Sequence, residues 1–272
     1  MTGGEAALLD APSGAQRAPI LSLRGIGKSY GAVVALTGVD LDLHSGEVLA
    51  VCGDNGAGKS SLIKIVSGAQ EASGGAMILR GEPVRFRSPH DALRRGLATI
   101  YQDLALAPRL SIAENVFMGA ELTRRVGPLR LLDKARMRAE ARGYLARLGV
   151  AIEDTSRPVE GLSGGQRQAV AISRALRWEA SIVVMDEPTA ALGVKETAGV
   201  LGLVLRLRDE GRAVILVSHA MRDVAEVATR VAILKNGRKV VDRPVERLTA
   251  DEIGHMIMTG RDLDSAAREG GA

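Results

Sequence analysis

The sequence predicts an α/β fold in which helices cover a largely parallel sheet. Three short apolar runs, at residues 48–52, 182–185 and 213–217, have the length and composition of buried strands. Segments with helical patterns follow the first two, at residues 58–66 and 194–208. A strand–helix–strand order is typical of parallel sheets, because a crossover must carry the chain back to the same edge.

The N-terminal part predicts shorter strands. Between residues 20 and 53, Asp40 and Asp42 alternate with apolar neighbours, as in a strand with one buried face. Residues 76–86 have the pattern of a β-hairpin, and residues 97–101 form a further candidate strand. We therefore expect an antiparallel subdomain beside the parallel sheet.

Helical patterns take over between residues 103 and 179, which predicts an inserted helical subdomain. Ser111 and Glu114 have the spacing of a capping box, in which each side chain accepts the backbone N–H of the other residue. Asp133 precedes a second helix. Its apolar face would comprise Met137, Ala141, Tyr144 or Leu145, and Leu148.

The C-terminal part predicts a hairpin and a last helix. Residues 231–241 form two candidate strands across Lys235-Asn236-Gly237, and Thr249 with Glu252 forms another capping box. We expect one folded domain over residues 20–260. Flexible tails at residues 1–19 and 261–272 are expected because both ends are rich in small residues and lack periodicity.

The composition is that of a globular protein and argues against several classes. Of 272 residues, 46% are apolar and 25% charged, which excludes a chain that is mainly disordered. A single cysteine, Cys52, and the lack of Cys/His clusters favour a reducing compartment without structural zinc. No signal peptide is expected, and no apolar run approaches the roughly 20 residues of a membrane helix. The net charge of +4 is modest and aromatic residues are few, so we expect no nucleic-acid partner.

A glycine-rich loop is the strongest functional signal. Gly53-Asp54-Asn55-Gly56-Ala57-Gly58-Lys59-Ser60 matches G-x-x-x-x-G-K-S/T and stands between an apolar strand and a helix, the context that this pattern requires. Glycines let the backbone N–H groups turn toward phosphate oxygens. Lys59 would neutralise the β- and γ-phosphates, and the Ser60 hydroxyl would bind Mg²⁺. The loop therefore predicts a nucleoside triphosphate site.

Two carboxylates follow the strand at residues 182–185. Adjacent side chains on a strand point to opposite faces, so Asp186 and Glu187 cannot have the same role. We expect Asp186 to support Mg²⁺ through a water molecule. Glu187 would orient and deprotonate the attacking water. The pair stands at the carboxyl end of its strand, where open α/β sheets bind their ligands.

A second candidate anion site lies in the helical subdomain. Leu162-Ser163-Gly164-Gly165-Gln166 begins a helix with a serine cap and two glycines, and one nucleotide does not need two such cradles in one chain. On these residues, and on the order of its motifs over residues 20–260, the chain resembles the ATP-binding subunits of ABC transporters. The resemblance implies a P-loop NTPase core of the ABC type, with an antiparallel β subdomain and an inserted helical subdomain. It also implies that Ser163, Gly164, Gly165 and Gln166 act on the ATP of an opposite protomer.

The resemblance gives roles to three further residues. Tyr30 corresponds to the aromatic residue that stacks on adenine, Gln102 to the glutamine that reaches Mg²⁺ and the water, and His219 to the switch histidine at the γ-phosphate. Catalysis is then expected from Glu187, His219 and Gln102, and Mg²⁺ binding from Ser60, Gln102 and Asp186 through water. The expected ATP-binding residues are Tyr30, Gly53, Asp54, Asn55, Gly56, Ala57, Gly58, Lys59, Ser60 and Ser61.

A finer resemblance connects the chain with ATPases of monosaccharide importers, those for ribose, xylose and fructose. It rests on residues 100–108 with Ala113-Glu114-Asn115, and on residues 188–196. One position departs from the wider family: Gly193 stands where many members have an aspartate, which leaves coupling between two ATP sites an open question.

The chain carries one set of motifs, so the resemblance implies a head-to-tail dimer with itself or with a paralogue. The implied function is ATP hydrolysis that drives monosaccharide uptake at the cytoplasmic face of the inner membrane. The partners would be a permease and, indirectly, a sugar-binding protein. Leu104 and Leu106 are the candidate permease contacts, because they lie in a loop before Pro108. An ATPase of another transporter, including an exporter, and a nontransport ABC protein are the alternatives, and the sugar is not encoded in this chain.

Overall fold

A six-stranded sheet forms the centre of the computed structural model, which describes residues 18–190, 192–246 and 248–263. Five of its strands are parallel and only the first in the order pairs antiparallel. Across the sheet the order is β12 (Arg238–Pro244), β11 (Arg230–Lys235), β3 (Val48–Cys52), β10 (Ala213–Val217), β9 (Ile182–Asp186) and β6 (Leu97–Ile100). The expected α/β fold is confirmed. The flexibility expected of the tails concerns mostly residues outside the described ranges.

The order of the parallel strands brings the predicted functional motifs to one edge of the sheet. The glycine-rich loop follows β3, residues 218–219 follow β10, the acidic pair ends β9, and Gln102 comes shortly after β6. These four strands are parallel neighbours, so their carboxyl ends lie along one edge of the sheet.

Both faces of the sheet are covered, which explains its continuous apolar strands. Val183 and Met185 pack with the helical side, whereas Ile182 and Val184 pack with the antiparallel side. A smaller group with Cys52 packs against the last two helices; there, burial raises the pKa of the Cys52 thiol to about 12, in keeping with a core residue. The covering helices outside the insertion are α1 (Lys59–Val66), α2 (Pro89–Arg94), α6 (Val194–Asp209), α7 (Met221–Val227) and α8 (Ala250–Thr259).

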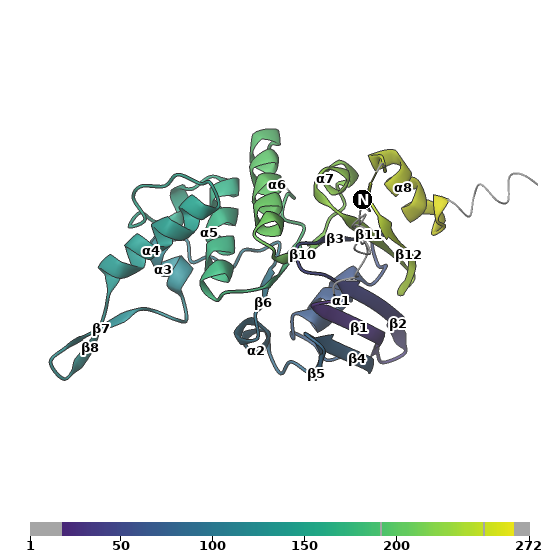
Figure 1. Cartoon of the computed structure of the whole chain (residues 1–272), viewed down its shortest axis with the longest axis horizontal. Helices are drawn as coiled ribbons and strands as arrows, with labels where there is room; N and C mark the ends of the chain where they lie inside the picture. Colours follow the sequence, from purple (N-terminus) through teal and green to yellow (C-terminus); the bar gives the residue numbers. More distant parts are fainter. Residues whose placement is uncertain (1–17, 191, 247, 264–272) are drawn as a thin grey trace, which may run out of the picture.

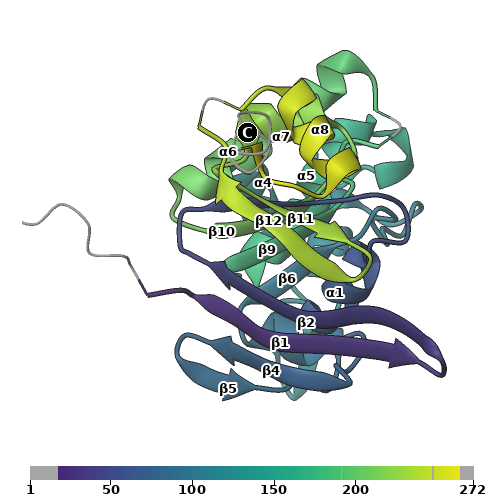
Figure 2. The ribbon, with the colours of Figure 1, turned by 90° about the vertical axis from the view of Figure 1, so that its right-hand side faces the viewer.

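A four-stranded antiparallel sheet forms the separate layer seen below the central sheet in Figure 2. Its order is β2 (Val33–Leu43), β1 (Leu21–Tyr30), β4 (Gly74–Leu79) and β5 (Glu82–Val84). This confirms the expected antiparallel subdomain.

The insertion extends to one side of the sheet in Figure 1. It contains α3 (Ile112–Phe117), α4 (Lys134–Arg147), the 3₁₀ turn η1 (Val159–Gly161) and α5 (Gly164–Arg177). The capping box of Ser111 and Glu114 is present, and Met137, Ala141 and Leu145 form the buried face of α4. None of the helices in the described ranges is both long and apolar enough to span a bilayer.

The insertion is not helical throughout, which corrects the sequence expectation. β7 (Thr123–Val126) and β8 (Leu129–Leu132) form a two-stranded hairpin between α3 and α4. Gly127 and Pro128 make the turn, and Gly127 has a φ of 60°, which glycine adopts at little cost. The two strands are short and do not join either larger sheet, so the local turn was their main sequence signal.

Candidate nucleotide-binding site

The glycine-rich loop can take its course only with glycine at two positions. Gly53 has a φ of 150° and Gly58 a φ of 105°. A Cβ added at Gly53 would lie 2.3 Å from the carbonyl oxygen of Leu234, and one at Gly58 would lie 2.6 Å from Cδ2 of Leu36. Any side chain would therefore push the loop off β11 and β2. The loop is held at the end of β3, where α1 begins.

Lys59 lies inside the curl of this loop. Its ammonium group donates hydrogen bonds to the carbonyl oxygens of Gly53 at 2.6 Å and Asp54 at 2.9 Å. Burial lowers the pKa of Lys59, while the negative charge of Glu187 acts in the opposite direction. The site therefore holds a positive charge within the glycine-rich loop at the start of α1, where a phosphate chain can bind.

The acidic pair at the end of β9 meets His219. The Nε2 atom of His219 lies 3.0 Å from Oε1 of Glu187, and the Glu187 N–H donates to the carbonyl oxygen of Val217 at 2.9 Å. Glu187 adopts a left-handed φ of 50°, which is uncommon outside glycine and concentrates at functional sites. Burial raises the pKa of the neighbouring Asp186, with the charge of Glu187 as a second cause. Two predicted catalytic residues thus lie in contact.

Gln102 reaches the same region from β6. Its exposed side chain lines a cavity of about 440 Å³, together with Leu106, Gly164 and Glu187. The cavity lies where the loop after β6, the start of α5 and the loop after β9 meet. It brings a predicted signature residue near a predicted catalytic residue of the same chain.

Two residues to which the sequence analysis gave no role hold the loop after Gln102. Arg174, on α5, donates to the carbonyl oxygens of Leu104 at 3.0 Å and Ala105 at 3.2 Å. Asn115 is fully buried on α3, accepts the N–H of Ala107 at 2.8 Å, and donates to the carbonyl oxygens of residues 107, 110 and 111. A polar side chain on an otherwise apolar helix face was the available signal for Asn115. Arg174 had none, because its contacts span about 70 residues of sequence.

The signature motif has the expected local structure. The Ser163 hydroxyl accepts the N–H of Gln166 at 3.3 Å, and the Gln166 side chain accepts the N–H of Ser163 at 3.1 Å. Within the described ranges, no hydrogen bond or ion pair joins residues 163–166 to residues 53–61. In a single chain, no polar contact between described residues therefore joins the signature segment to the glycine-rich loop.

Glu196 is the third residue that the sequence did not identify. Its Oε1 accepts the N–H of Gly164 at 2.9 Å, and its Oε2 lies 3.4 Å from the N–H of Gly193. One carboxylate thus joins the signature helix to the loop that follows the acidic pair. A Cβ at Gly193 would meet no atom within 4 Å, so this glycine is not required by packing.

Tyr30 lies beside the start of α1. Its hydroxyl donates to the side-chain oxygen of Gln70 and lies 3.5 Å from the hydroxyl of Ser61. The side chain is 42% exposed, so its ring is open to a ligand at the edge of the glycine-rich loop. This position is compatible with the predicted adenine contact.

The residues expected to hold Mg²⁺ suit that ion. Ser60, Gln102 and Asp186 all offer oxygen atoms, which Mg²⁺ prefers, and Mg²⁺ sites beside phosphates use few protein ligands because phosphate oxygens and water complete the octahedron. No cluster of three or more His, Cys, Asp or Glu residues that could hold a metal occurs in the part of the chain described.

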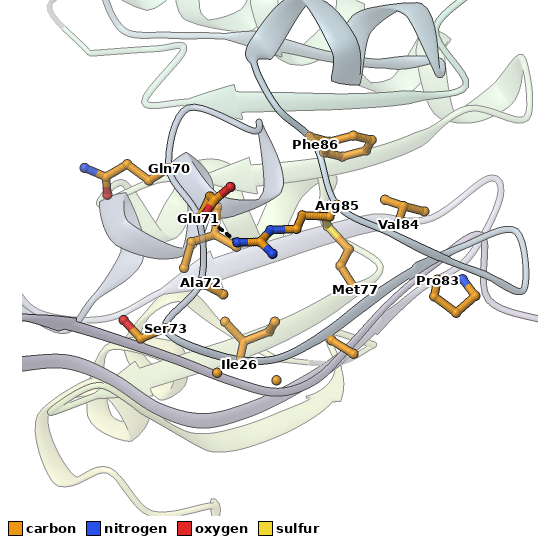
Figure 3. A pocket seen from close by; sticks show the side chains of 14 residues that line it. Ile26, Gln70, Glu71, Ala72, Ser73, Met77, Pro83, Val84, Arg85 and Phe86 are labelled. Atoms are coloured by element: carbon orange, nitrogen blue, oxygen red, sulfur yellow. Dashed lines mark hydrogen bonds and ion pairs between the residues drawn. The ribbon is translucent and has the colours of Figure 1, made fainter.

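A separate cavity of about 490 Å³ lies beside the antiparallel sheet (Figure 3). Ile26, Met77 and Phe86 contribute apolar walls, and Glu71 forms a 2.5 Å ion pair with Arg85 across it. None of the predicted nucleotide-site residues lines this cavity.

Comparison with known proteins agrees with this geometry. The family model described as "ABC transporter" matches residues 36–190. The chain belongs to this family and is an ATP-hydrolysing, ATP-binding subunit of the ABC class.

Several similar proteins are ATP-binding subunits named for sugar import. The chain is 49% identical over 244 residues to the fructose import ATP-binding protein FrcA of Rhizobium meliloti, covering 88% of this chain and 94% of that one. It is 45% identical over 253 residues to the ribose import ATP-binding protein RbsA 1 of Streptomyces coelicolor, covering 93% of this chain but 49% of that one. The chain thus spans about half the length of its ribose-import relatives. A solved dimeric bacterial ABC transporter cassette matches with a TM-score of 0.67 and 25% identity, over 83% of this chain and 98% of that one.

Proposed function

We propose that this chain hydrolyses ATP to drive import of a monosaccharide through a partner permease. The observation that carries the proposal is the contact of Glu187 with His219 at the edge of the sheet that also holds the Lys59 loop. The names of two relatives, a fructose import and a ribose import ATP-binding protein, support the substrate class.

The geometry supports a division of labour during hydrolysis. Loop N–H groups and Lys59 hold the phosphate chain, and Tyr30 provides a face for the adenine ring. Glu187 takes the proton of the attacking water, and His219, 3.0 Å away, orients this carboxylate and faces the γ-phosphate. Mg²⁺, held by Ser60, Gln102 and, through water, Asp186, would neutralise charge on the phosphate oxygens.

The separation of the two phosphate-binding surfaces supports a head-to-tail homodimer. Neither surface completes the site alone, whereas a second copy can place its Ser163–Gln166 segment over the Lys59 loop. The dimeric solved cassette is in keeping with this arrangement. Two ATP molecules would lie between the protomers.

The loop after Gln102 supports the permease contact. Leu104 and Leu106 are half-buried, and both line the 440 Å³ cavity beside Glu187. A permease helix that docks there would touch the loop that follows Gln102, so docking would be mechanically connected to ATP hydrolysis. Such a subunit works at the cytoplasmic face of the inner membrane, with a sugar-binding protein acting through the permease.

The test is uptake of labelled ribose, xylose and fructose by cells from which this chain has been deleted. We expect uptake of at least one sugar to be lost, restored by the wild-type chain, and not restored by Glu187→Gln produced at the same level. Uptake of all three sugars that is independent of the chain would contradict the substrate class. Normal uptake with Glu187→Gln would contradict the assigned chemistry.

A further inference from the structure

The hairpin of β7 and β8 projects from the insertion without a protein partner. In Figure 1 it extends beyond α3 and α4 at the far end of the molecule. All eight residues of its two strands are exposed. An isolated two-stranded hairpin is marginally stable in water, so a surface that covered this one would stabilise it.

Three arginines give the hairpin an unbalanced positive charge. Residues 123–132 include Arg124, Arg125 and Arg130 but no carboxylate. Arg125 lies directly opposite Arg130, so two like charges share one face, an arrangement that destabilises a strand pair. Within the described ranges, none of the three guanidinium groups forms an ion pair or hydrogen bond.

The first two cations of the neighbouring helix α4 are paired, unlike the arginines of the hairpin. Lys134 pairs with Glu114 at 3.1 Å, and Arg136 pairs with Glu140 at 2.7 Å. The hairpin thus places three unpaired cations within a ten-residue segment that contains no carboxylate. An anionic partner would relieve its repulsion.

The tip of the hairpin is apolar. Val126, Gly127, Pro128 and Leu129 form it, and Val126 and Leu129 are 45% and 61% exposed. Leu131 lies on the same face as these two side chains, because residues two apart on a strand share a face. Arg124 and Arg125 stand two residues and one residue before the tip on β7, and Arg130 stands one residue after it on β8. An apolar tip with a collar of cations matches the interface of an anionic bilayer, where apolar groups enter the acyl boundary and guanidinium groups meet lipid phosphates.

We propose that residues 123–132 dock on the anionic lipid surface of the membrane. Charge complementarity favours this partner, because the arginines lie on both faces of the hairpin. A bilayer surrounds an inserted tip on all sides and can pair with both faces. A protein groove would need acidic groups on two opposed walls. The inference rests on the proposed function, which places the chain beside a membrane. Docking would hold the insertion in a fixed orientation while the ATP sites open and close.

The experiment is sedimentation of the purified full chain with phosphatidylcholine vesicles that contain or lack phosphatidylglycerol. We expect binding only to the anionic vesicles, with a steep loss as salt is raised. Arg124→Gln/Arg125→Gln/Arg130→Gln should weaken binding roughly 100-fold, because each basic residue near the surface contributes about fivefold. Val126→Ser/Leu129→Ser should weaken it about tenfold through loss of the apolar tip.

The matched control is Arg94→Gln/Arg142→Gln/Arg222→Gln, which removes the same charge from exposed positions on α2, α4 and α7. It should bind almost as the wild type does. Equal binding to neutral vesicles, an equal loss in the control, or full binding by the hairpin triple variant would overturn the proposal. If the wild-type chain fails to bind anionic vesicles and the hairpin triple variant no longer co-purifies with the permease, the proposal is also overturned, in favour of a protein contact. ATP hydrolysis, measured on every sample, reports on the proposed function separately and is expected to be unchanged.

Discussion

The proposed mechanism assigns the general base to one side chain, Glu187. Its carboxylate lies 3.0 Å from Nε2 of His219 and shares the sheet edge with Lys59. Glu187→Gln keeps the size of the side chain but removes the basic oxygen, so ATP should still bind while turnover falls roughly 10²–10⁴-fold. Steady-state hydrolysis and nucleotide binding on the same sample measure both quantities. Glu160→Gln, on the wall of the same cavity, is the control; near-normal turnover in Glu187→Gln would remove the residue from the role of base.

Glu196 connects two motifs through a pair of backbone contacts. Glu196→Ala removes the acceptor for Gly164 N–H, 2.9 Å away, and the contact with Gly193. A hydrogen bond to a charged group is worth about 1.5–3 kcal/mol, so we expect turnover to fall about tenfold or more while ATP binding to the phosphate loop is kept. Glu196→Gln retains an oxygen acceptor and should recover most of the activity. If the alanine variant turns over normally, the link has no role in the reaction.

At the scale of elements, local signals were the most predictable. The capping boxes that begin α3 and α8 follow from residues three apart, and both are present. The serine cap expected at the start of α5 is also present, as part of a third capping box. The glycine-rich loop was equally predictable, because its pattern already includes the flanking strand and helix.

Contacts between distant elements were not predictable. Arg174 and Glu196 act across about 70 and 32 residues of sequence, and no local pattern encodes such a distance. The contact of Glu187 with His219 required the order of β9 and β10 in the sheet, which the family resemblance implied and periodicity alone did not. The β7 and β8 hairpin was missed because its strands are only four residues long, show no regular alternation of polar and apolar residues, and bury neither face.

Glu114 makes the stability of the insertion depend on pH. Hydrogen bonds from Ser111 and the nearby Lys134 hold the pKa of the Glu114 carboxyl at about 2, below its usual 4.5. Above pH 4.5 the group is charged in the folded and unfolded chain, and its stabilisation is complete. The stabilisation is lost as the pH falls from 4.5 through about 2, because in this interval the unfolded chain binds a proton that the folded chain does not.

Glu114→Gln should therefore lower the free energy of unfolding by on the order of 2 kcal/mol near neutral pH. The difference from wild type should shrink to nothing near pH 2. Urea unfolding at a series of pH values measures it, with the exposed Glu153→Gln as the control that should show no such trend. A difference that is constant with pH would assign the effect to side-chain shape rather than to charge.

At the scale of the whole molecule, the proposed homodimer joins the glycine-rich loop of one copy to the signature segment of the other, and this predicts how defective copies combine. Lys59→Ala should abolish ATP binding, because the loop loses its positive charge. Ser163→Arg should leave binding by the single chain intact and block closure of the dimer, since its side chain would occupy the opposing phosphate site. Each variant alone should be nearly inactive.

Mixing the two variants at equal concentration should restore one working interface in the mixed dimers, because one protomer keeps its Lys59 loop and the other its Ser163 segment. Hydrolysis by the mixture, compared with either variant alone, measures the recovery. Mixing wild type with Glu187→Gln supplies the reference for a dimer with one defective catalytic site. Full activity of either variant by itself would show that each chain completes its own site.

Docking on a permease would involve the whole molecule, because the cavity beside Gln102 joins the sheet to the insertion. Leu106 is half-buried on its wall and packs against the helical core, in the loop that Arg174 holds. Leu106→Glu places a charge on this wall and should abolish permease association and sugar uptake, while ATP hydrolysis by the isolated chain changes little. Leu110→Glu, 41% exposed on the same loop but outside the cavity wall, is the matched control and should assemble normally. Co-purification with the permease and the urea unfolding midpoint are measured for each variant. A Leu106→Glu chain that still assembles with the permease shows that the contact lies elsewhere. An unfolding midpoint far below that of Leu110→Glu assigns Leu106 to the core of the insertion.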